Sequence, residues 1–164
     1  EAQLDRFLMH VRVGYPDAAD EKAILALTRA EAHSQAQPAP PAEAMISQQN
    51  LRQARNDVLD IHLDASLEDY IIEIILATRS AERYGEELAG WIQHGASPRA
   101  TMALDRCARA YAWLKGRDYV VPEDIQLLAP DVLRHRIILS FAAEAEGKTA
   151  DSCIDAVLSR VAVP

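Results

Sequence analysis

Residues 95–101 read Gly-Ala-Ser-Pro-Arg-Ala-Thr, and they open the most clearly defined helix in the sequence. Ser97 is a favourable N-cap, and Pro98 suits the first helical position because its φ is already fixed near the helical value. Arg99 then falls in the first turn, where the helix dipole disfavours a cation. Because free amide groups at a helix start attract anions, we expect an anion beside Arg99, and a phosphate is the natural candidate.

The helix that this stretch begins is amphipathic over residues 98–115. Its apolar stripe consists of Ala100, Leu104, Cys107, Ala108, Tyr111 and Leu114. Arg99 and Arg106 are seven residues apart in the sequence and therefore share a different face of the helix. Gly116 is suited to end it.

Further helices are expected on both sides. A segment over residues 66–76, begun by a capping-box-like Ser66 to Asp69, is apolar nearly all round and should be central to the core. Other helical patterns cover residues 2–9, 17–29, 48–59, 86–92, 122–129 and 150–161, with Pro130 expected to break the one before it. The fold predicted is mainly α, an irregular helical bundle with at most a small amount of β.

Three segments are expected to be non-helical. Residues 11–13 alternate in polarity and are typical of an edge strand, and residues 58–63 read as extended. Residues 31–46 are rich in Ala, Gln and Pro, which indicates a loop or linker. In residues 133–141, helix and strand compete.

Composition excludes several classes of protein. The formal net charge of −8 argues against a chain that as a whole binds nucleic acid, including a helix-turn-helix binder. No apolar run is long enough to span a bilayer. The two cysteines, Cys107 and Cys153, are too far apart in the sequence for a zinc pattern or a disulfide framework, and we interpret them as reduced core residues of a cytoplasmic protein.

The sequence lacks the signatures of a complete enzyme. It contains no Gly-x-x-x-x-Gly-Lys-Ser/Thr loop, and its five histidines lack convincing metal-ligand spacing, so no metal site is expected. Because the chain starts without methionine and with a helical pattern, we expect it to be a fragment of a longer protein.

Two further basic positions are candidates for function. Arg6, in Leu4-Asp5-Arg6-Phe7, is interpreted either as a surface arginine paired with Asp5 or as an arginine finger offered to a phosphate on a neighbouring subunit. The cluster at residues 134–136 (Arg-His-Arg) is better explained by cations near a helix carboxyl terminus than by a ligand site.

Taken together, several segments resemble the C-terminal part of a MoxR-family AAA+ ATPase. In order along the chain they are Glu1-Ala2-Gln3-Leu4-Asp5-Arg6-Phe7, Gly14-Tyr15-Pro16, Tyr70-Ile71, Ala77-Thr78-Arg79, Gly95-Ala96-Ser97-Pro98-Arg99-Ala100, Gly116-Arg117-Asp118-Tyr119-Val120, Pro122-Glu123-Asp124 and Val132-Leu133-Arg134-His135-Arg136. Each is weak alone, but their order and spacing are specific and cover nearly the whole chain.

The resemblance implies a division of the chain and roles for two arginines. Residues 1–15 would be the end of the nucleotide-binding αβ core, and residues 16–164 the helical lid. Arg99 would be the sensor-2 residue, contacting the terminal phosphates of ATP from the lid of the same subunit, with Ser97 and Pro98 shaping its helix start. Arg6 would be the arginine finger, acting in trans.

The resemblance also implies a wider function. The parent protein would hydrolyse ATP with Mg²⁺ as a ring, commonly a hexamer, that remodels other proteins in a chaperone-like way. Its partners would be its own AAA+ core and proteins with a von Willebrand factor A domain. Because the P-loop is absent here, the fragment alone is expected to be inactive.

Two points remain open in the sequence. The segment of residues 80–94 looks longer than the corresponding segment of the family, so the family pattern does not predict how the chain packs in front of Arg99. The alternative function is a helical interaction module that docks a client or adaptor protein.

Overall fold

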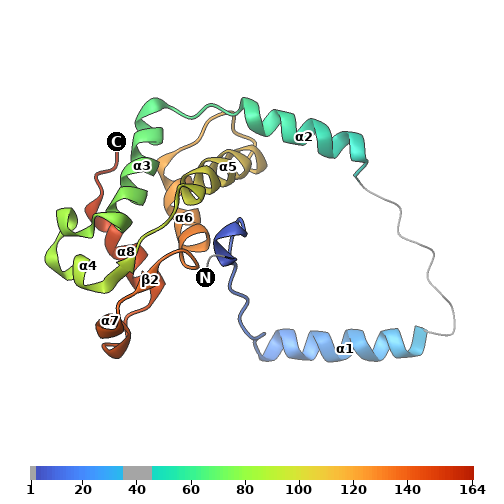
Figure 1. The fold of residues 1–164 in the computed structure, drawn as a ribbon. Coiled ribbons are helices and arrows are strands. Elements are labelled where there is room, and N and C mark those ends of the chain that lie inside the picture. The colour runs from blue at the N-terminus through green and yellow to red at the C-terminus, as the bar shows by residue number, and fades with distance from the viewer. Residues whose placement is uncertain (1–2, 35–45) are drawn as a thin grey trace. The chain divides into compact units, whose positions relative to one another are not determined.

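The computed structural model describes residues 3–34 and 46–164, and the fold is mainly α, as expected (Figure 1). The chain divides into two compact units, one made of residues 1–11 and 52–164 and the other of residues 12–51. The elements in order are η1 (Leu4–Arg6), α1 (Ala18–Ser34), α2 (Gln48–Asp60), α3 (Ala65–Arg79), η2 (Ala81–Tyr84), α4 (Glu86–Trp91), β1 (Ile92–His94), α5 (Pro98–Leu114), α6 (Pro122–Leu133), β2 (Ile138–Leu139), α7 (Phe141–Ala145) and α8 (Ala150–Arg160).

The core of the larger unit lies where α3, α5, α6 and α8 meet. Helix α5 packs on α3 and α6, and α8 packs on the same two helices. Each of the four contributes a side chain with no exposed surface, namely Ile74, Leu104, Ile125 and Ile154. Burying a side chain of this size contributes about 1.5–3 kcal/mol. The apolar segment around residues 70–76 is therefore central to the core, as its composition predicts.

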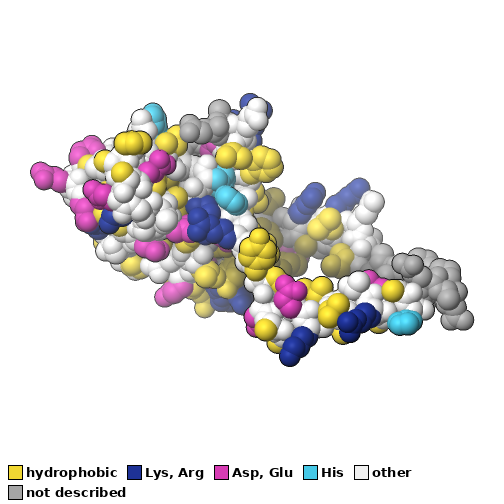
Figure 2. All heavy atoms as spheres, turned by 90° about the horizontal axis from the view of Figure 1, so that it is seen from below, with side chains coloured by type: hydrophobic (Ala, Val, Ile, Leu, Met, Phe, Trp, Pro, Cys, Tyr) yellow, Lys and Arg dark blue, Asp and Glu magenta, His cyan; other side chains and the backbone are white. Residues whose placement is uncertain are grey.

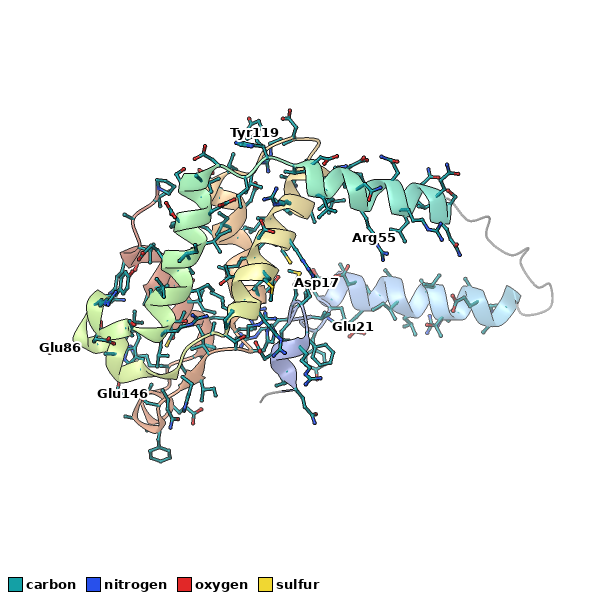
Figure 3. The ribbon with its side chains drawn as sticks, turned by 45° about the horizontal axis from the view of Figure 1, so that its top comes forward. Asp17, Glu21, Arg55, Glu86, Tyr119 and Glu146 are labelled. Atoms are coloured by element: carbon teal, nitrogen blue, oxygen red, sulfur yellow. The ribbon has the colours of Figure 1, made fainter. Side chains whose placement is uncertain are left out.

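The start of α5 is as the sequence predicts. Pro98 is the first residue of the helix, and the Ser97 hydroxyl accepts a hydrogen bond from the Arg99 amide at 3.2 Å. In the smaller unit, the Asp17 carboxylate accepts from the amides of Ala19 and Asp20 at 2.8 and 2.9 Å and begins α1 in the same way (Figure 3). Both helices are thus started by a side chain that satisfies a free backbone donor.

Two helix boundaries differ from expectation. Helix α3 starts at Ala65 and is capped by Asp64, which accepts from the Ser66 amide at 2.9 Å, so Ser66 is inside the helix and does not cap it. Pro130 does not end α6, which continues to Leu133. The Pro130 carbonyl still accepts from the Arg134 amide at 3.0 Å, so the helical hydrogen bonds continue after the proline although its own N–H is missing.

The segments expected to be non-helical also differ in part. Residues 11–13 form no strand; their neighbour His10 donates its amide to the Asp131 carbonyl of α6, at 2.8 Å, instead of joining a sheet. Helix α1 continues through residues 31–34, which were expected to be a loop, and residues 35–45 of that expected linker lie outside the described residues. Residues 58–60 belong to α2.

Residues 80–94 fold into η2, α4 and β1, and β1 pairs antiparallel with β2. The chain then leaves β1 against the end of α3: the Ala96 amide donates to the Thr78 hydroxyl at 2.9 Å, and the Arg79 Nε donates to the Ala96 carbonyl at 2.6 Å. Ala96 is fully buried. Ala96 directly precedes the cap residue Ser97, so these contacts fix the point at which α5 begins.

Gly95 is predicted to be intolerant of even a methyl group. An alanine Cβ there would lie 2.2 Å from the Thr78 carbonyl oxygen and 2.5 Å from its carbon, and backbone atoms cannot move aside. Gly95→Ala should therefore destabilise the chain by about 1–3 kcal/mol or more, as overpacking does. Urea denaturation measures the effect. Gly90→Ala is the matched control because a Cβ there meets nothing within 4 Å; equal stability of the two variants would contradict the packing described.

Candidate functional site

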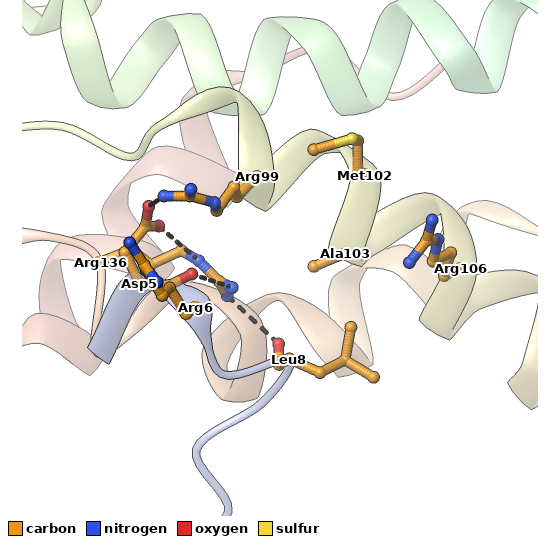
Figure 4. Close-up of a pocket in the computed structure, with 8 residues that line it drawn as sticks. All are labelled: Asp5, Arg6, Leu8, Arg99, Met102, Ala103, Arg106 and Arg136. Atoms are coloured by element: carbon orange, nitrogen blue, oxygen red, sulfur yellow. Dashed lines mark hydrogen bonds and ion pairs between the residues drawn. The ribbon is translucent and has the colours of Figure 1, made fainter. Parts of the chain in front are cut away.

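A pocket of about 340 Å³ lies where the first residues of the chain meet α5. Figure 4 shows its lining: Asp5, Arg6, Leu8, Arg99, Met102, Ala103, Arg106 and Arg136. All of these residues belong to the larger unit. The lining contains four arginines and one aspartate, although the net charge of the whole chain is −8. On the face of the larger unit that Figure 2 presents, acidic and basic side chains are interspersed. The pocket is therefore a local cationic site.

Arg99 has a counter-anion in this structure, and it is Asp5. The Arg99 NH1 group donates to the Asp5 Oδ2 at 2.9 Å, with 52% of the Arg99 side chain exposed. A guanidinium carries five N–H donors, and this bond uses a single nitrogen. The cation at the helix start is thus compensated by a carboxylate of the chain itself, and most of its donors stay available.

Asp5 accepts hydrogen bonds from three side chains. Its Oδ1 lies 2.9 Å from the Ser97 hydroxyl and 3.1 Å from Arg136 Nε, and its Oδ2 lies 2.9 Å from the same hydroxyl as well as contacting Arg99. Partial burial would raise the pKa of the Asp5 carboxyl, but the bonds from Arg99, Ser97 and Arg136 together lower that pKa below its ordinary value of 3.8. Asp5 is therefore an anion at neutral pH.

Arg136 is buried, and its guanidinium holds the chain at residues 5–8. Only 2% of the side chain is exposed. Besides the Asp5 carboxylate, the guanidinium donates to the carbonyls of Asp5, Phe7 and Leu8, at 3.1, 2.5 and 3.2 Å, and to the Val132 carbonyl of α6. We call this set of contacts the Arg136 clamp.

The interpretation of residues 134–136 as helix-end cations covers only part of what Arg136 does, because its guanidinium donates both to the Val132 carbonyl in the last turn of α6 and to the start of the chain. Arg134 does follow the end of α6 and pairs with Asp131 and Asp151. Arg136 instead turns inward, because carbonyl oxygens from the distant start of the chain satisfy its donors. A sequence signal for this was absent, since the partners are about 130 residues away.

Arg6 and Arg106 line the same pocket without a charged partner. Among the residues that the structure describes, neither side chain forms an ion pair, and the local pairing of Arg6 with Asp5 is not found because Asp5 faces Arg99 and Arg136. Arg99 and Arg106 do share one face of α5, as their spacing predicts. Two free cations and the free edge of Arg99 can together bind an anion.

Other chemistry has little support in the described ranges. Over residues 3–34 and 46–164, no three His, Cys, Asp or Glu side chains group in a way that could hold a metal ion. Cys107 and Cys153 are both buried, and burial raises the pKa of each thiol. None of the described helices is long and apolar enough to cross a membrane.

Comparison with known proteins identifies relatives of the whole chain. The AAA lid domain family matches residues 89–157. The chain is 35% identical to the chaperone MoxR1 of Mycobacterium tuberculosis, which it matches over 100% of its own length and 42% of that protein. It is 32% identical to the protein MoxR of Paracoccus denitrificans, over 99% of the chain and 50% of that protein.

A solved structure and a more distant relative extend these matches. The structure of a candidate ATPase from Cytophaga hutchinsonii superimposes with a TM-score of 0.89 at 38% identity, covering 99% of this chain and 48% of that one. The magnesium-chelatase subunit ChlI of Nicotiana tabacum is 32% identical over 82% of the chain and 29% of that subunit. The chain thus spans about half the length of the MoxR relatives.

The charge of Asp5 should make stability depend on pH. Because the folded-state pKa of Asp5 is lowered, its contribution is present above the ordinary pKa of 3.8 and is lost as the pH falls through the lower folded value. Asp5→Asn should therefore be less stable than the wild type at neutral pH, and the difference should shrink below about pH 4. Urea unfolding at several pH values measures this. A difference that is independent of pH would contradict the ion pairs described.

Proposed function

Because the chain belongs to the MoxR family of AAA+ proteins, we propose that it is the part of an ATPase that senses the nucleotide and closes over it. Residues 16–164 would be the lid, and residues 1–15 the end of the nucleotide-binding core. The P-loop and the magnesium ligands would lie outside this chain, and we assign it no magnesium ligand. By itself the chain would not turn over ATP.

The observation that carries this proposal is the pocket shared by Arg6 and Arg99. Both guanidiniums keep donors free for phosphate oxygens, and an arginine stays charged at any physiological pH and can hold two oxygens at once. The start of α5 adds the positive end of a helix dipole near the same place. An anion with several oxygens, such as the terminal phosphate of ATP, fits this arrangement.

The shared pocket also bears on how the two arginines divide their work. The family resemblance assigns Arg99 to the nucleotide of its own subunit and Arg6 to that of a neighbour. In this structure Arg6 and Arg99 line one pocket, so that one anion bound there would contact both. We therefore propose that Arg6 and Arg99 act on one phosphate group and stabilise the charge that develops on it during hydrolysis.

The wider assignment follows the family. We propose that the parent protein forms a homo-oligomeric ring, a hexamer in the family pattern, and that ATP hydrolysis with Mg²⁺ drives remodelling of partner proteins, including those with a von Willebrand factor A domain. One relative, the chaperone MoxR1 of Mycobacterium tuberculosis, supports this choice. Motion of the lid relative to the core would convert hydrolysis into work on a client.

Removing either arginine should impair ATP turnover by the full-length protein. Arg6→Ala should lower kcat about 10³-fold, the lower range for an arginine finger, because charge on the transferred phosphoryl group loses its partner. Arg99→Ala should lower it by about 10²-fold. Steady-state phosphate release measures both effects.

The control is Arg55→Ala, since Arg55 is exposed on α2 and outside the pocket (Figure 3). It should keep wild-type turnover, and circular dichroism should show that all three variants fold. Wild-type hydrolysis by Arg99→Ala and Arg6→Ala would refute the roles proposed for them.

A further inference from the structure

We propose that Arg136 is a positioning residue for the phosphate-binding arginines: the Arg136 clamp fixes the turn that carries Arg6 and, through Asp5, orients Arg99. This inference rests on the function proposed above. Arg136 itself is too buried to be a main ligand of the phosphate, because only 2% of its side chain is exposed.

The clamp holds the backbone on both sides of Arg6. One Arg136 nitrogen, NH2, donates to the carbonyl of Asp5 and to that of Phe7, which flank Arg6 directly. The turn itself is short, a 3-10 helix of three residues closed by the Phe7 amide on the Leu4 carbonyl at 3.0 Å. So short an element is not stable alone. Its placement on the pocket therefore depends on Arg136.

The other end of the clamp is anchored in the core of the larger unit. Arg136 NH1 donates to the Val132 carbonyl near the end of α6, and Val132 is fully buried. The guanidinium thus joins the end of α6 to a turn whose other contacts include those of Asp5 with Ser97 and Arg99 and of the Phe7 carbonyl with His135. Lysine cannot do this, because its three donors radiate from one nitrogen, whereas the planar guanidinium reaches partners on several sides.

Asp5 extends the same arrangement to Arg99. Its two carboxylate oxygens contact Arg136 at 3.1 Å and Arg99 at 2.9 Å (Figure 4). The bond to Arg99 leaves most donors of that guanidinium free, so Asp5 orients Arg99 without neutralising every site on it. Arg6 and Arg99 are therefore held in one geometry by one buried cation.

A double-mutant cycle on ATP turnover by the full-length protein tests the inference. The cycle compares wild type, Arg6→Ala, Arg136→Lys and the double variant. If Arg136 acts mainly by placing Arg6, Arg136→Lys should lower kcat by about tenfold in the wild type and by less than about twofold in the Arg6→Ala background, because residues that act as a unit are non-additive. Equal fold-losses in both backgrounds would overturn the placement of Arg6 by Arg136.

Arg117→Lys is the matched control for a loss of stability alone. Arg117 makes a two-pronged pair with the buried Asp124 in the same unit and touches none of residues 5–8. Arg117→Lys should lower the melting temperature as Arg136→Lys does. It should leave kcat within about twofold of wild type, because Arg117 shares no partner with the residues of the pocket. A loss of kcat equal to that of Arg136→Lys would also overturn the proposal.

Amide hydrogen exchange separates this inference from the proposed function. In Arg136→Lys the Phe7 amide should exchange at least about tenfold faster, because the turn opens locally. Unchanged exchange would overturn the positioning role even if turnover falls. Wild-type turnover by Arg6→Ala together with faster exchange in Arg136→Lys would instead refute the function proposed for Arg6 and leave the turn's dependence on Arg136 supported.

Discussion

A buried guanidinium, that of Arg136, joins the first residues of the chain to the helices that form its core. Burying a cation costs solvation energy, and such a pair is retained only where hydrogen bonds replace the lost water. Here four backbone carbonyls and the Asp5 carboxylate do so. A buried ion pair is weak evidence for stability, and we infer that this one serves to hold residues 5–8 in a fixed position on the core. The position of residues 5–8 on the core decides which of their side chains face the pocket.

The position of these residues explains why a chain that is acidic overall has a cationic pocket. Asp5 gives Arg99 an internal anion while it is itself held by Ser97 and Arg136. An incoming phosphate would meet an arginine already oriented at a helix start, beside Arg6, whose side chain lacks an ion pair among the described residues. Preorganisation of this kind is the main way in which fixed charges stabilise a transition state.

Local signals predicted the parts of the molecule that depend on local interactions. The start at Ser97 and Pro98 and the buried helix around Ile74 were predictable, because capping and apolar periodicity act over a few residues. The sequence was less clear where two local structures were possible: Asp64 caps α3 in place of Ser66, and α6 continues past Pro130. Arg99 and Arg6 were predicted as candidates, but their shared pocket was not. It depends on Arg136, whose partners are distant in sequence, so no periodicity reveals them.

We propose above that one chain presents Arg6 and Arg99 to one phosphate group. Mixing of full-length subunits tests it: subunits with Arg6→Ala are combined with subunits with Arg99→Ala, and ATP turnover by the mixed rings is measured. If both arginines of one chain serve one site, every site in the mixed ring lacks one of them, and turnover should stay at the level of the separate variants. Turnover that rises well above both separate variants would mean that different subunits supply the two arginines to each site, and it would contradict the account.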